Sequence, residues 1–536
     1  MSSAANYNWR HVLSETNFLL KAQIEEILTN STMNNSNNLR LGGKNVTAIL
    51  SGVSRLLSHQ GHRGYIVGGF IRDWLLGRQT NDIDIAVDGD ALNVAGEMAK
   101  GLGGKFVLLD EVNSIARVVV VEEGQQWHLD FSSFLGNVES DLARRDFTVN
   151  AVAVELGQLG ADIEVKLIDP FSGKEDLTNR TVRAVSGQIF EADAARLLRA
   201  VRLAAELGFT IEMKTESLIR HYSQSITKVP GERVREELLR VLSLPRAAHY
   251  LRYLDELSLL LPLIPELAES KGVEQPTVHF WDVFDHSLQT VATVEFLLRE
   301  NDWEYGNEDM LTAVSWSDAI AQHLSQEVSK GNTRKALLKL GGLFHDIAKP
   351  RTKSVNNTGR AHFYGHARQG ADMAAAILGR LRFSNKEISL VKSLVYHHLR
   401  PVQMSRSREL PTQRAIYRYF RDIDDAGIDI LFLALADYLA SRGPLVNMEE
   451  WKRHCQLMNY ILTEQEKQQA KVLPVKLIDG HDLINIFGLA PGPLIGKLLA
   501  LVDEGRASGE LTTREEALTL VRRELNKQQC GARSGN

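Results

Sequence analysis

Hydrophobic and polar positions divide the chain into two regions with different periodicities. Between residues 46 and 185, short apolar runs alternate with helical segments, and Asp82 to Val87 alternates polar and apolar residues strictly. A period of two indicates a β-strand with one buried face. Arg117 to Val121 and Trp127 to Phe131 flank the turn Glu122-Glu123-Gly124, which is typical of a β-hairpin. The first region therefore predicts a mixed α/β unit.

From Glu191 onward the pattern is helical. Leu197, Val201 and Ala204 recur at helical spacing, and similar patterns continue to about residue 525. Breaks rich in proline and glycine divide this region at Val229-Pro230-Gly231, Leu261-Pro262, Arg442-Gly443-Pro444 and Ala490-Pro491-Gly492-Pro493. Residues 1–45 include a run of Asn, Ser and Thr that is too polar to pack, so we expect a disordered leader there.

Composition narrows the class of protein. The 536 residues are 44% hydrophobic and 24% charged, which is typical of a globular protein and excludes a disordered chain. The formal net charge of −5 argues against coating nucleic acid by bulk charge, but it leaves a local basic groove open. Cys455 and Cys530 provide no disulfide framework and no Cys-x-x-Cys metal site. Because membrane-spanning and signal-peptide patterns are missing, we expect a cytoplasmic protein that binds no membrane.

Two carboxylates on the predicted strand suggest a metal site. Asp82 and Asp84 are two residues apart, so both side chains leave the same face of the strand. Neighbouring carboxylates repel unless a cation lies between them, and Mg²⁺ prefers oxygen ligands. Upstream, Gly68-Gly69 lies between a strand and a helix, where the backbone can approach a phosphate closely, and Arg72 can add a charge-assisted contact. An exposed strand face beside a tight turn is the alternative.

Four motifs, in order and spacing, resemble the class II tRNA nucleotidyltransferases and bacterial poly(A) polymerases. They are Gly68 to Gly77 with Asn81 to Asp84, then Arg144 to Ala151, then Asp169-Pro170-Phe171 with Gly173-Lys174 and Asp176-Leu177, and finally Asp193 to Arg202. The resemblance covers roughly residues 60–250. It implies an α/β nucleotidyltransferase head, a mixed sheet with helices, followed by an all-α neck, body and tail. The implied activity is metal-dependent addition of CCA, or part of it, to a tRNA 3′ end from CTP and ATP, with release of pyrophosphate.

The resemblance also implies roles for individual residues. Asp82 and Asp84 are expected to hold catalytic Mg²⁺. Asp130, on the second strand of the hairpin, is a third catalytic candidate that would activate the primer 3′-hydroxyl, although an ordinary strand-end aspartate fits equally well. The expected nucleotide-binding residues are Gly68, Gly69, Arg72, Arg145, Asp146, Asn150, Asp193, Arg196, Arg199 and Arg202.

Asp193 and Arg196 are the candidates for base selection. At i and i+3 on one helix face they would present an acceptor and a forked donor side by side, which matches an edge of cytosine or adenine. In the family this pair replaces a nucleic-acid template. A surface salt bridge is the alternative. The family's motif often has an acidic residue where this chain has Ala192, which leaves the fine tuning of base selection open.

The connection between two motifs is short. Only 14 residues lie between Asp130 and Arg145, whereas many family members that add the full CCA end carry a longer flexible loop there. Short-loop members include enzymes that add only the two cytidines. Addition of CCA, of a part such as CC alone, and synthesis of poly(A) by a bacterial poly(A) polymerase all remain open, because the head motifs are shared.

Histidines and aspartates in the helical region resemble the HD phosphohydrolase superfamily. The expected ligands of a divalent metal of unknown identity are His286, His345, Asp346, His366, His397 and Asp437. His397 and His398 project about 100° apart on a helix, so we expect only one of them, His397, to be a ligand. The resemblance implies a further expectation, because bacterial members of the nucleotidyltransferase family can carry such a domain with phosphatase or 2′,3′-cyclic phosphodiesterase activity. A third alternative is an HD phosphohydrolase whose head only binds RNA.

These motifs predict a linear order of parts. The expected parts are a leader at 1–45, a nucleotidyltransferase head at 46–185, a helical neck for base and RNA binding at 186–265, an HD body at 266–445, and a helical, RNA-binding tail at 446–536. Gly488 to Gly496 in the tail resembles a segment of HD-containing bacterial members, and its glycines allow close backbone approach to RNA. The expected partners are tRNA, CTP and ATP, and the oligomeric state is open.

Overall fold

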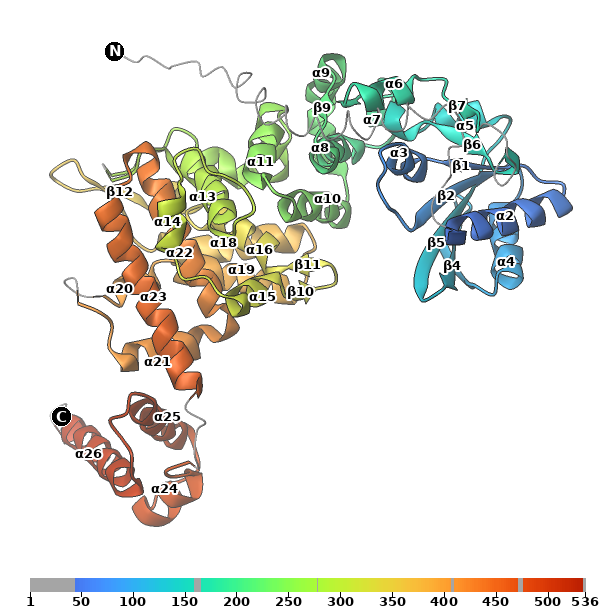
Figure 1. Ribbon diagram of the computed structural model, residues 1–536. Helices are drawn as coiled ribbons and strands as arrows, with labels where there is room; N and C mark the ends of the chain where they lie inside the picture. The colour runs from blue at the N-terminus through green and yellow to red at the C-terminus, as the bar shows by residue number, and fades with distance from the viewer. Residues whose placement is uncertain (1–43, 159–164, 277, 406–408, 471–475, 534–536) are drawn as a thin grey trace. The chain divides into compact units, whose positions relative to one another are not determined.

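The computed structural model describes residues 44–158, 165–276, 278–405, 409–470 and 476–533 (Figure 1). It divides into two compact units, Met1–Ile189 and Phe190–Asn536, which we describe separately. The predicted leader lies outside the described residues except for Lys44 and Asn45, where the first described helix begins.

A seven-stranded mixed sheet forms the first unit. Its strand order is β3-β4-β5-β2-β1-β6-β7, and among the described pairs of this sheet β2 and β5 run parallel while the others are antiparallel. The predicted hairpin is β4–β5. The strands are β1 (Gly64–Val67), β2 (Asp82–Val87), β3 (Lys105–Asp110), β4 (Ile115–Glu122), β5 (Gln125–Ser133), β6 (Ala153–Glu155) and β7 (Leu167–Ile168). The predicted α/β head is confirmed.

Alternation along the strands gives the sheet two different faces. Ile83 and Ile85 of β2 point into the larger core, where they pack with α2 (Lys44–His59) and α4 (Ala91–Gly101). Ala86 points to the opposite face and packs with a smaller cluster under α5 (Val138–Leu142). Because side chains alternate, Asp82 and Asp84 lie on the same side of β2 as Ala86. The large core thus leaves the carboxylates on the other face.

The second unit is largely helical, as predicted. Its neck and body helices include α8 (Arg196–Leu207), α9 (Met213–Tyr222), α10 (Gly231–Ser243), α11 (Ala247–Glu256), α13 (Val283–Leu297), α16 (Arg334–Phe344), α18 (His366–Arg380), α19 (Asn385–His397), α21 (Gln413–Ile423) and α22 (Gly427–Arg442), and α23 (Met448–Ala470) follows within the range predicted for the tail. α13 and α22 are buried over most of their circumference and pack on each other, because their sequences are apolar nearly all round. They form the centre of the body.

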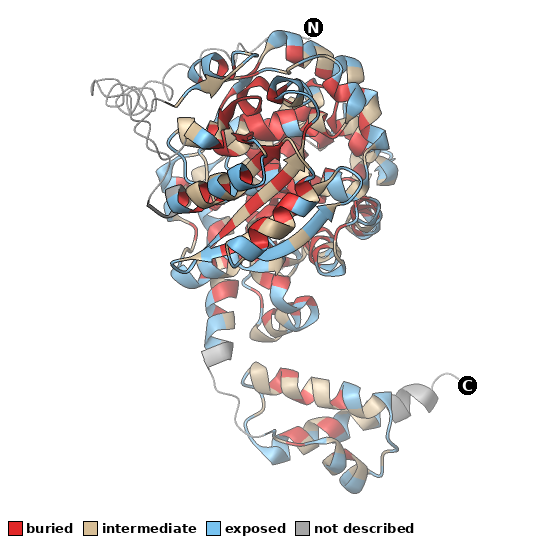
Figure 2. Ribbon diagram, turned by 90° about the vertical axis from the view of Figure 1, so that its right-hand side faces the viewer, coloured by how far each residue is buried: buried red, intermediate tan, exposed pale blue. Residues whose placement is uncertain are grey.

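Three helices make a small separate core in the tail: α24 (Gly480–Phe487), α25 (Pro493–Ala507) and α26 (Arg514–Arg533). Leu483, Leu498 and Val521, one from each helix, are buried in this core. Figure 2 shows each residue's burial along the ribbon. The short strand pairs β10–β11 (Glu327–Ser329, Asn332–Thr333) and β12–β13 (Lys353–Val355, Ala361–Phe363) interrupt the body, and the helical pattern gave no sign of them. Within the described ranges, no helix has the length and apolarity needed to cross a membrane.

Candidate nucleotidyl-transfer site and metal centre

Two adjacent strands bring the three predicted catalytic carboxylates together. β2 runs parallel to β5 in a register that places Asp84 beside Asp130 and Asp82 beside His128. Neighbouring strands lie about 4.8 Å apart, so these side chains share one small area of the sheet. Asp82 is exposed and Asp84 is half-buried. The arrangement gives a cluster of carboxylate oxygens at the surface, which is the chemistry that Mg²⁺ prefers.

Asp130 and Asp82 each have a side-chain partner that was not predicted from the sequence. Arg117 of β4 donates from Nε and Nη2 to the two oxygens of Asp130, at 2.7 and 2.8 Å. The Nδ1 atom of His128 lies 2.8 Å from Oδ1 of Asp82. The hydrogen bond to Asp130 and the charges of all three carboxylates raise the pKa of Arg117, although burial opposes this. The guanidinium therefore stays charged and offsets part of the mutual repulsion of the carboxylates.

The turn before α3 (Gly69–Leu75) contacts this cluster directly. Gly68 has φ = 75°, and a Cβ at this position would lie 2.7 Å from both Oδ2 of Asp84 and Nη1 of Arg145. Glycine is thus required twice, for the positive φ and for the close approach. The predicted phosphate-binding turn, one of the carboxylates and Arg145 therefore lie against one another.

Residues of the first two motifs form a hydrogen-bonded chain. Nη1 of Arg72 donates to Oδ1 of Asn150 at 2.8 Å, and Nδ2 of Asn150 donates to Oδ1 of Asp146 at 3.0 Å. Asp146 and Asn150 are only 6% and 4% exposed. Nε of Arg145 donates to Asp141 at 3.2 Å. The predicted nucleotide-binding residues of the head therefore lie together, with Asp146 and Asn150 fixed in the protein and the two arginines nearer the surface.

The predicted base-selecting pair differs from expectation. Asp193 lies in the turn between α7 (Ile189–Ala192) and α8, not on the helix that begins at Arg196. Its carboxylate accepts two hydrogen bonds from Arg233 of α10, at 2.9 and 2.7 Å, whereas Nε of Arg196 is 4.0 Å away. Burial would raise the pKa of Asp193, but the hydrogen bonds from Arg233 and the backbone outweigh it and lower the pKa. The main partner of Asp193 is therefore Arg233.

The expected nucleotide-binding arginines of α8 differ in burial. Arg199 is exposed, but Arg202 is buried and donates to Glu237 and Glu206, each at 2.5 Å. Two carboxylates already neutralise this guanidinium, so the prediction that Arg202 binds nucleotide does not fit its position. The helical spacing alone could not distinguish the inner arginine from the outer ones.

Most of the predicted HD residues converge in the centre of the body. Nε2 of His286, on α13, lies 3.1 Å from Nε2 of His345, 3.3 Å from Asp346 and 3.1 Å from Asp437 on α22. His366, at the start of α18, lies 3.3 Å from the other oxygen of Asp346. Asp346 therefore belongs to two groups of possible ligands.

The second group contains His398 and not the predicted His397. His398 is 1% exposed, and its Nε2 lies 3.4 Å from that of His366 and 3.8 Å from Asp346. His397 is partly exposed and lies outside both groups. Because successive helical residues point about 100° apart, only one of the two can face the cluster. The two groups are His286, His345 and Asp346, and Asp346, His366 and His398.

The hydrogen bonds around these histidines fit a metal centre. The Nδ1 atoms of His345, His366 and His398 lie 2.8, 2.6 and 2.7 Å from the backbone carbonyl oxygens three residues earlier. Donation from Nδ1 leaves each Nε2 lone pair directed at the centre, the arrangement that a ligating imidazole adopts. Burial lowers the pKa of His398 to about 3, which keeps that imidazole neutral.

The carboxylate between the two groups also fits a cation. Neither oxygen of Asp346 receives a well-aligned hydrogen bond from the described residues, although the Lys349 ammonium lies 2.5 Å from Oδ2. Burial opposes charge at His345, yet Asp346 and Asp437 raise its pKa to about 10. The centre thus attracts positive charge, and a divalent ion between the Nε2 atoms and Asp346 would satisfy these groups.

Comparison with known proteins places these sites in one family. Family models match in order over the poly A polymerase head domain (residues 64–183), the "Probable RNA and SrmB- binding site of polymerase A" (208–271) and the HD domain (283–442). An A-adding tRNA nucleotidyltransferase of Deinococcus radiodurans is 34% identical over 464 residues, covering 85% of this chain and 94% of that protein. A CC-adding tRNA nucleotidyltransferase of Thermus thermophilus is 34% identical over 459 residues, covering 84% and 91%.

The chain belongs to the class II tRNA nucleotidyltransferase family. Solved structures agree in fold. A CCA-adding enzyme in complex with ATP matches with a TM-score of 0.62 at 21% identity, covering 91% of this chain and 95% of that one. The Thermotoga maritima CCA-adding enzyme bound to tRNA matches with a TM-score of 0.58 at 22% identity, covering 90% and 97%. The family resemblance carried by the four motifs is confirmed, and the protein is a tRNA nucleotidyltransferase that adds CCA or part of it.

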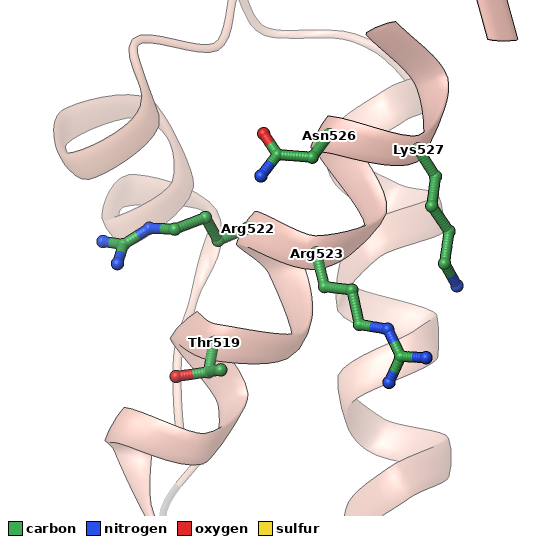
Figure 3. A pocket seen from close by; sticks show the side chains of 5 residues that line it. All are labelled: Thr519, Arg522, Arg523, Asn526 and Lys527. Atoms are coloured by element: carbon green, nitrogen blue, oxygen red, sulfur yellow. The ribbon is translucent and has the colours of Figure 1, made fainter. Parts of the chain in front are cut away.

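The tail of this tRNA nucleotidyltransferase has a cluster of basic side chains on α26. Arg522, Arg523 and Lys527 are exposed there with Thr519 and Asn526 beside them, and Figure 3 shows Arg522 and Arg523 leaving the helix in different directions. The predicted segment Gly488 to Gly496 forms the connection between α24 and α25, and Gly488 ends α24 with φ = 66°. Within the described residues, the tail therefore has positively charged side chains on α26 and a glycine-containing turn between α24 and α25.

Proposed function

We propose that this enzyme adds the two cytidines of the CCA end to tRNA, using CTP and releasing pyrophosphate. The observation that carries the proposal is the connection between Asp130 and Arg145. β5 ends at Ser133 and α5 occupies Val138–Leu142, which leaves six residues of this connection outside regular elements. Three of its apolar side chains, Phe134, Val138 and Leu142, are buried in the smaller core.

A packed connection of this kind cannot move as a free loop. The side chain of Asn137 also caps α5 by accepting from the backbone N–H of Ser140 at 2.9 Å. By family resemblance, a longer flexible loop here accompanies the change from CTP to ATP, and short-loop members include enzymes that add only cytidines. CC-adding relatives from Thermus thermophilus and Geobacter sulfurreducens match along most of their length, which is in keeping with the proposal.

The head residues have complementary roles in this reaction. Asp82 and Asp84 would hold Mg²⁺, which when bound stabilises the charge on the attacking and leaving oxygens. Gly68 and the N-terminal end of α3 would face the triphosphate, and Arg145 would contribute a charge-assisted contact. Asp130 would accept the proton of the primer 3′-hydroxyl as that oxygen attacks the α-phosphate in line. Arg117 donates to both oxygens of Asp130, so in this step one of these hydrogen bonds must lengthen, or one oxygen must accept from Arg117 and from the 3′-hydroxyl together.

The neck would supply the choice of base. Asp193 and Arg196 would pair with the edge of the incoming cytosine, with the carboxylate accepting from the exocyclic amino group and the guanidinium donating to ring acceptors. Arg199, exposed on the same helix, would neutralise phosphate. The exposed basic side chains of α26 would contact the tRNA backbone in a way that does not depend on sequence.

The metal centre of the body supports a second candidate activity, hydrolysis of a phosphate ester such as a 2′,3′-cyclic phosphate. His286, His345, Asp346, His366 and His398 would hold a divalent metal there, which would polarise a phosphoryl oxygen and lower the pKa of an attacking water. Mixed imidazole and carboxylate ligands favour a transition metal over Mg²⁺. Release of phosphate from a cyclic phosphate by the wild type, and its loss in Asp346→Ala, would support this activity.

Product sizing tests the main proposal. A tRNA transcript without CCA and one ending in CC would each be incubated with CTP alone, ATP alone and both. We expect two nucleotides from CTP on the first transcript and none from ATP on either. Addition of one adenosine to the CC transcript would identify an A-adding or CCA-adding enzyme and would contradict the proposal.

A further inference from the structure

The carboxylate predicted to read the incoming base is held by a residue from another helix. Arg233 is 40 positions after Asp193, and its Nη1 and Nη2 atoms donate to Oδ1 and Oδ2 of Asp193 at 2.9 and 2.7 Å. Oδ1 also accepts from the backbone N–H of Ala195 at 3.1 Å. A two-pronged contact of this type fixes the plane of a carboxylate as well as its position.

We infer that Arg233 is a positioning residue for base selection, because it orients Asp193 so that the remaining lone-pair site of the carboxylate faces the edge of cytosine. The inference rests on the proposed role of Asp193 in reading the base. A carboxylate has about four lone-pair sites. Arg233 and Ala195 occupy three of them, and the carboxylate keeps acceptor capacity for an exocyclic amino group.

The division of roles between the two arginines follows from their distances. Arg196 lies 4.0 Å from Asp193 and is therefore not committed to it in the way that Arg233 is. Its guanidinium can donate to the base while Arg233 holds the acceptor beside it.

The helix that carries Arg233 is itself fixed by the body. A Cβ on Gly231, the first residue of α10, would lie 2.5 Å from the backbone oxygen of Arg380 at the end of α18. One turn later, Nη1 of Arg235 donates to the backbone oxygen of Arg382 at 2.5 Å. Val234 and Leu238 on α10 are buried. The position of Arg233 is thus set by the packing of α10 against the α18–α19 connection.

The preference of the enzyme for CTP over UTP measures how well Asp193 is oriented. Cytosine and uracil differ at C4, where cytosine carries an amino donor and uracil a carbonyl acceptor. A correctly oriented carboxylate accepts from the first and repels the second, and a polar mismatch in a shaped site costs much more than a lost contact. A misoriented carboxylate loses this discrimination, whereas the phosphoryl-transfer chemistry in the head is unaffected.

The test compares single-nucleotide incorporation of CTP and UTP by the full chain and its variants. For Arg233→Ala we expect the ratio of kcat/KM for CTP to that for UTP to fall by about tenfold or more, mainly through a higher KM for CTP. Arg233→Lys, which keeps the charge but not the fork, should recover only part of the ratio. Arg240→Ala, exposed two turns further along α10, is the matched control and should keep the wild-type ratio.

Two further variants separate positioning from a general loss of structure. In an Asp193→Ala background, Arg233→Ala should cause no further loss of discrimination. Gly231→Ala, which displaces α10, should lower the ratio in the same direction as Arg233→Ala. An unchanged ratio in Arg233→Ala would overturn the inference. If the wild type does not incorporate cytidine from CTP, the proposed function itself is wrong. This result differs from an unchanged ratio in Arg233→Ala, which would overturn only the role of Arg233.

Discussion

Arg117 on β4 donates two hydrogen bonds to Asp130 on β5, and Asp130 in turn lies beside Asp84 on β2. The third carboxylate of the head is therefore oriented by a cation on one side, and it lies beside the aspartates of β2 on the other. This relationship explains how three acidic side chains can be close together on one sheet face. It also makes Asp130 the residue whose role is most in need of a measurement.

Replacement of Asp130 should slow the chemical step. If Asp130 accepts the proton of the 3′-hydroxyl, Asp130→Asn will lower kcat for CTP by about 100-fold or more, because the amide cannot accept a proton. The KM for CTP should change little, since Asp130 does not contact the base. Single-turnover incorporation under saturating CTP measures this. Glu122→Gln, at the other end of the hairpin, is the control, and near-normal kcat in Asp130→Asn would assign Asp130 to the support of Arg117 instead.

The close approach at Gly68 gives a second prediction. Gly68→Ala must displace Asp84 or Arg145, because the new methyl group would lie 2.7 Å from each. We expect incorporation of CTP to fall by about 100-fold. Gly77→Ala has a similar positive φ of 68° but nothing within 4 Å of the added Cβ, so it carries the backbone strain without the clash. It should cost about 1 kcal/mol of stability and keep activity. Equal losses of activity in the two variants would show that strain, not contact, is responsible.

Adjacent histidines test the metal centre of the body. His398→Ala removes a buried Nε2 that faces Asp346, whereas His397→Ala removes a partly exposed ring outside the cluster. After purification and dialysis, elemental analysis should find less bound divalent transition metal in His398→Ala and the wild-type amount in His397→Ala. CTP incorporation should be unaffected in both, because it takes place at the head. Loss of metal in His397→Ala alone would contradict the ligand set.

A partly buried histidine on α23, His454, predicts a loss of stability in acid. Burial lowers the pKa of His454 to about 4, below its ordinary value of 6.5, and its ring stacks on Tyr438. The folded protein holds this imidazole neutral while the unfolded chain protonates it, so stability is lost as the pH falls from about 6.5 towards 4, by up to about 3 kcal/mol. In His454→Gln this part of the acid dependence should disappear. Thermal melts between pH 7 and 4.5 measure it, and parallel curves for both proteins would refute the assignment.

The sequence predicted those features of the site that depend on residues close together along the chain. The period of two in Asp82 to Val87 placed both aspartates on one strand face, and the hairpin signal placed Asp130 on the neighbouring strand. Arg117 could have been found in the same way. In this hairpin Glu122 pairs with Gln125, and counting back along both strands gives the pair of Arg117 with Asp130.

Contacts between distant helices could not be predicted from the pattern. Nothing in the spacing connects Arg233 with Asp193, and the choice between His397 and His398 depends on how α19 is rotated against its neighbours. Arg202 was predicted to bind nucleotide because its motif resembles that of the family, and the motif does not show which side of the helix each arginine occupies. Arg202 donates to Glu237 of α10, so packing between helices determines its surroundings.

The most direct test of the whole account is incorporation of radiolabelled CTP by Asp84→Ala. The account predicts that a tRNA transcript without CCA gains two cytidines with the wild type and none with the variant. The variant should keep the wild-type circular dichroism spectrum and melting temperature, because Asp84 is half-buried and lies outside the large core. Glu97→Gln, on the exposed side of α4, should incorporate CTP normally. Substantial incorporation by a folded Asp84→Ala enzyme would contradict the central claim that the carboxylates of β2 carry out nucleotide transfer.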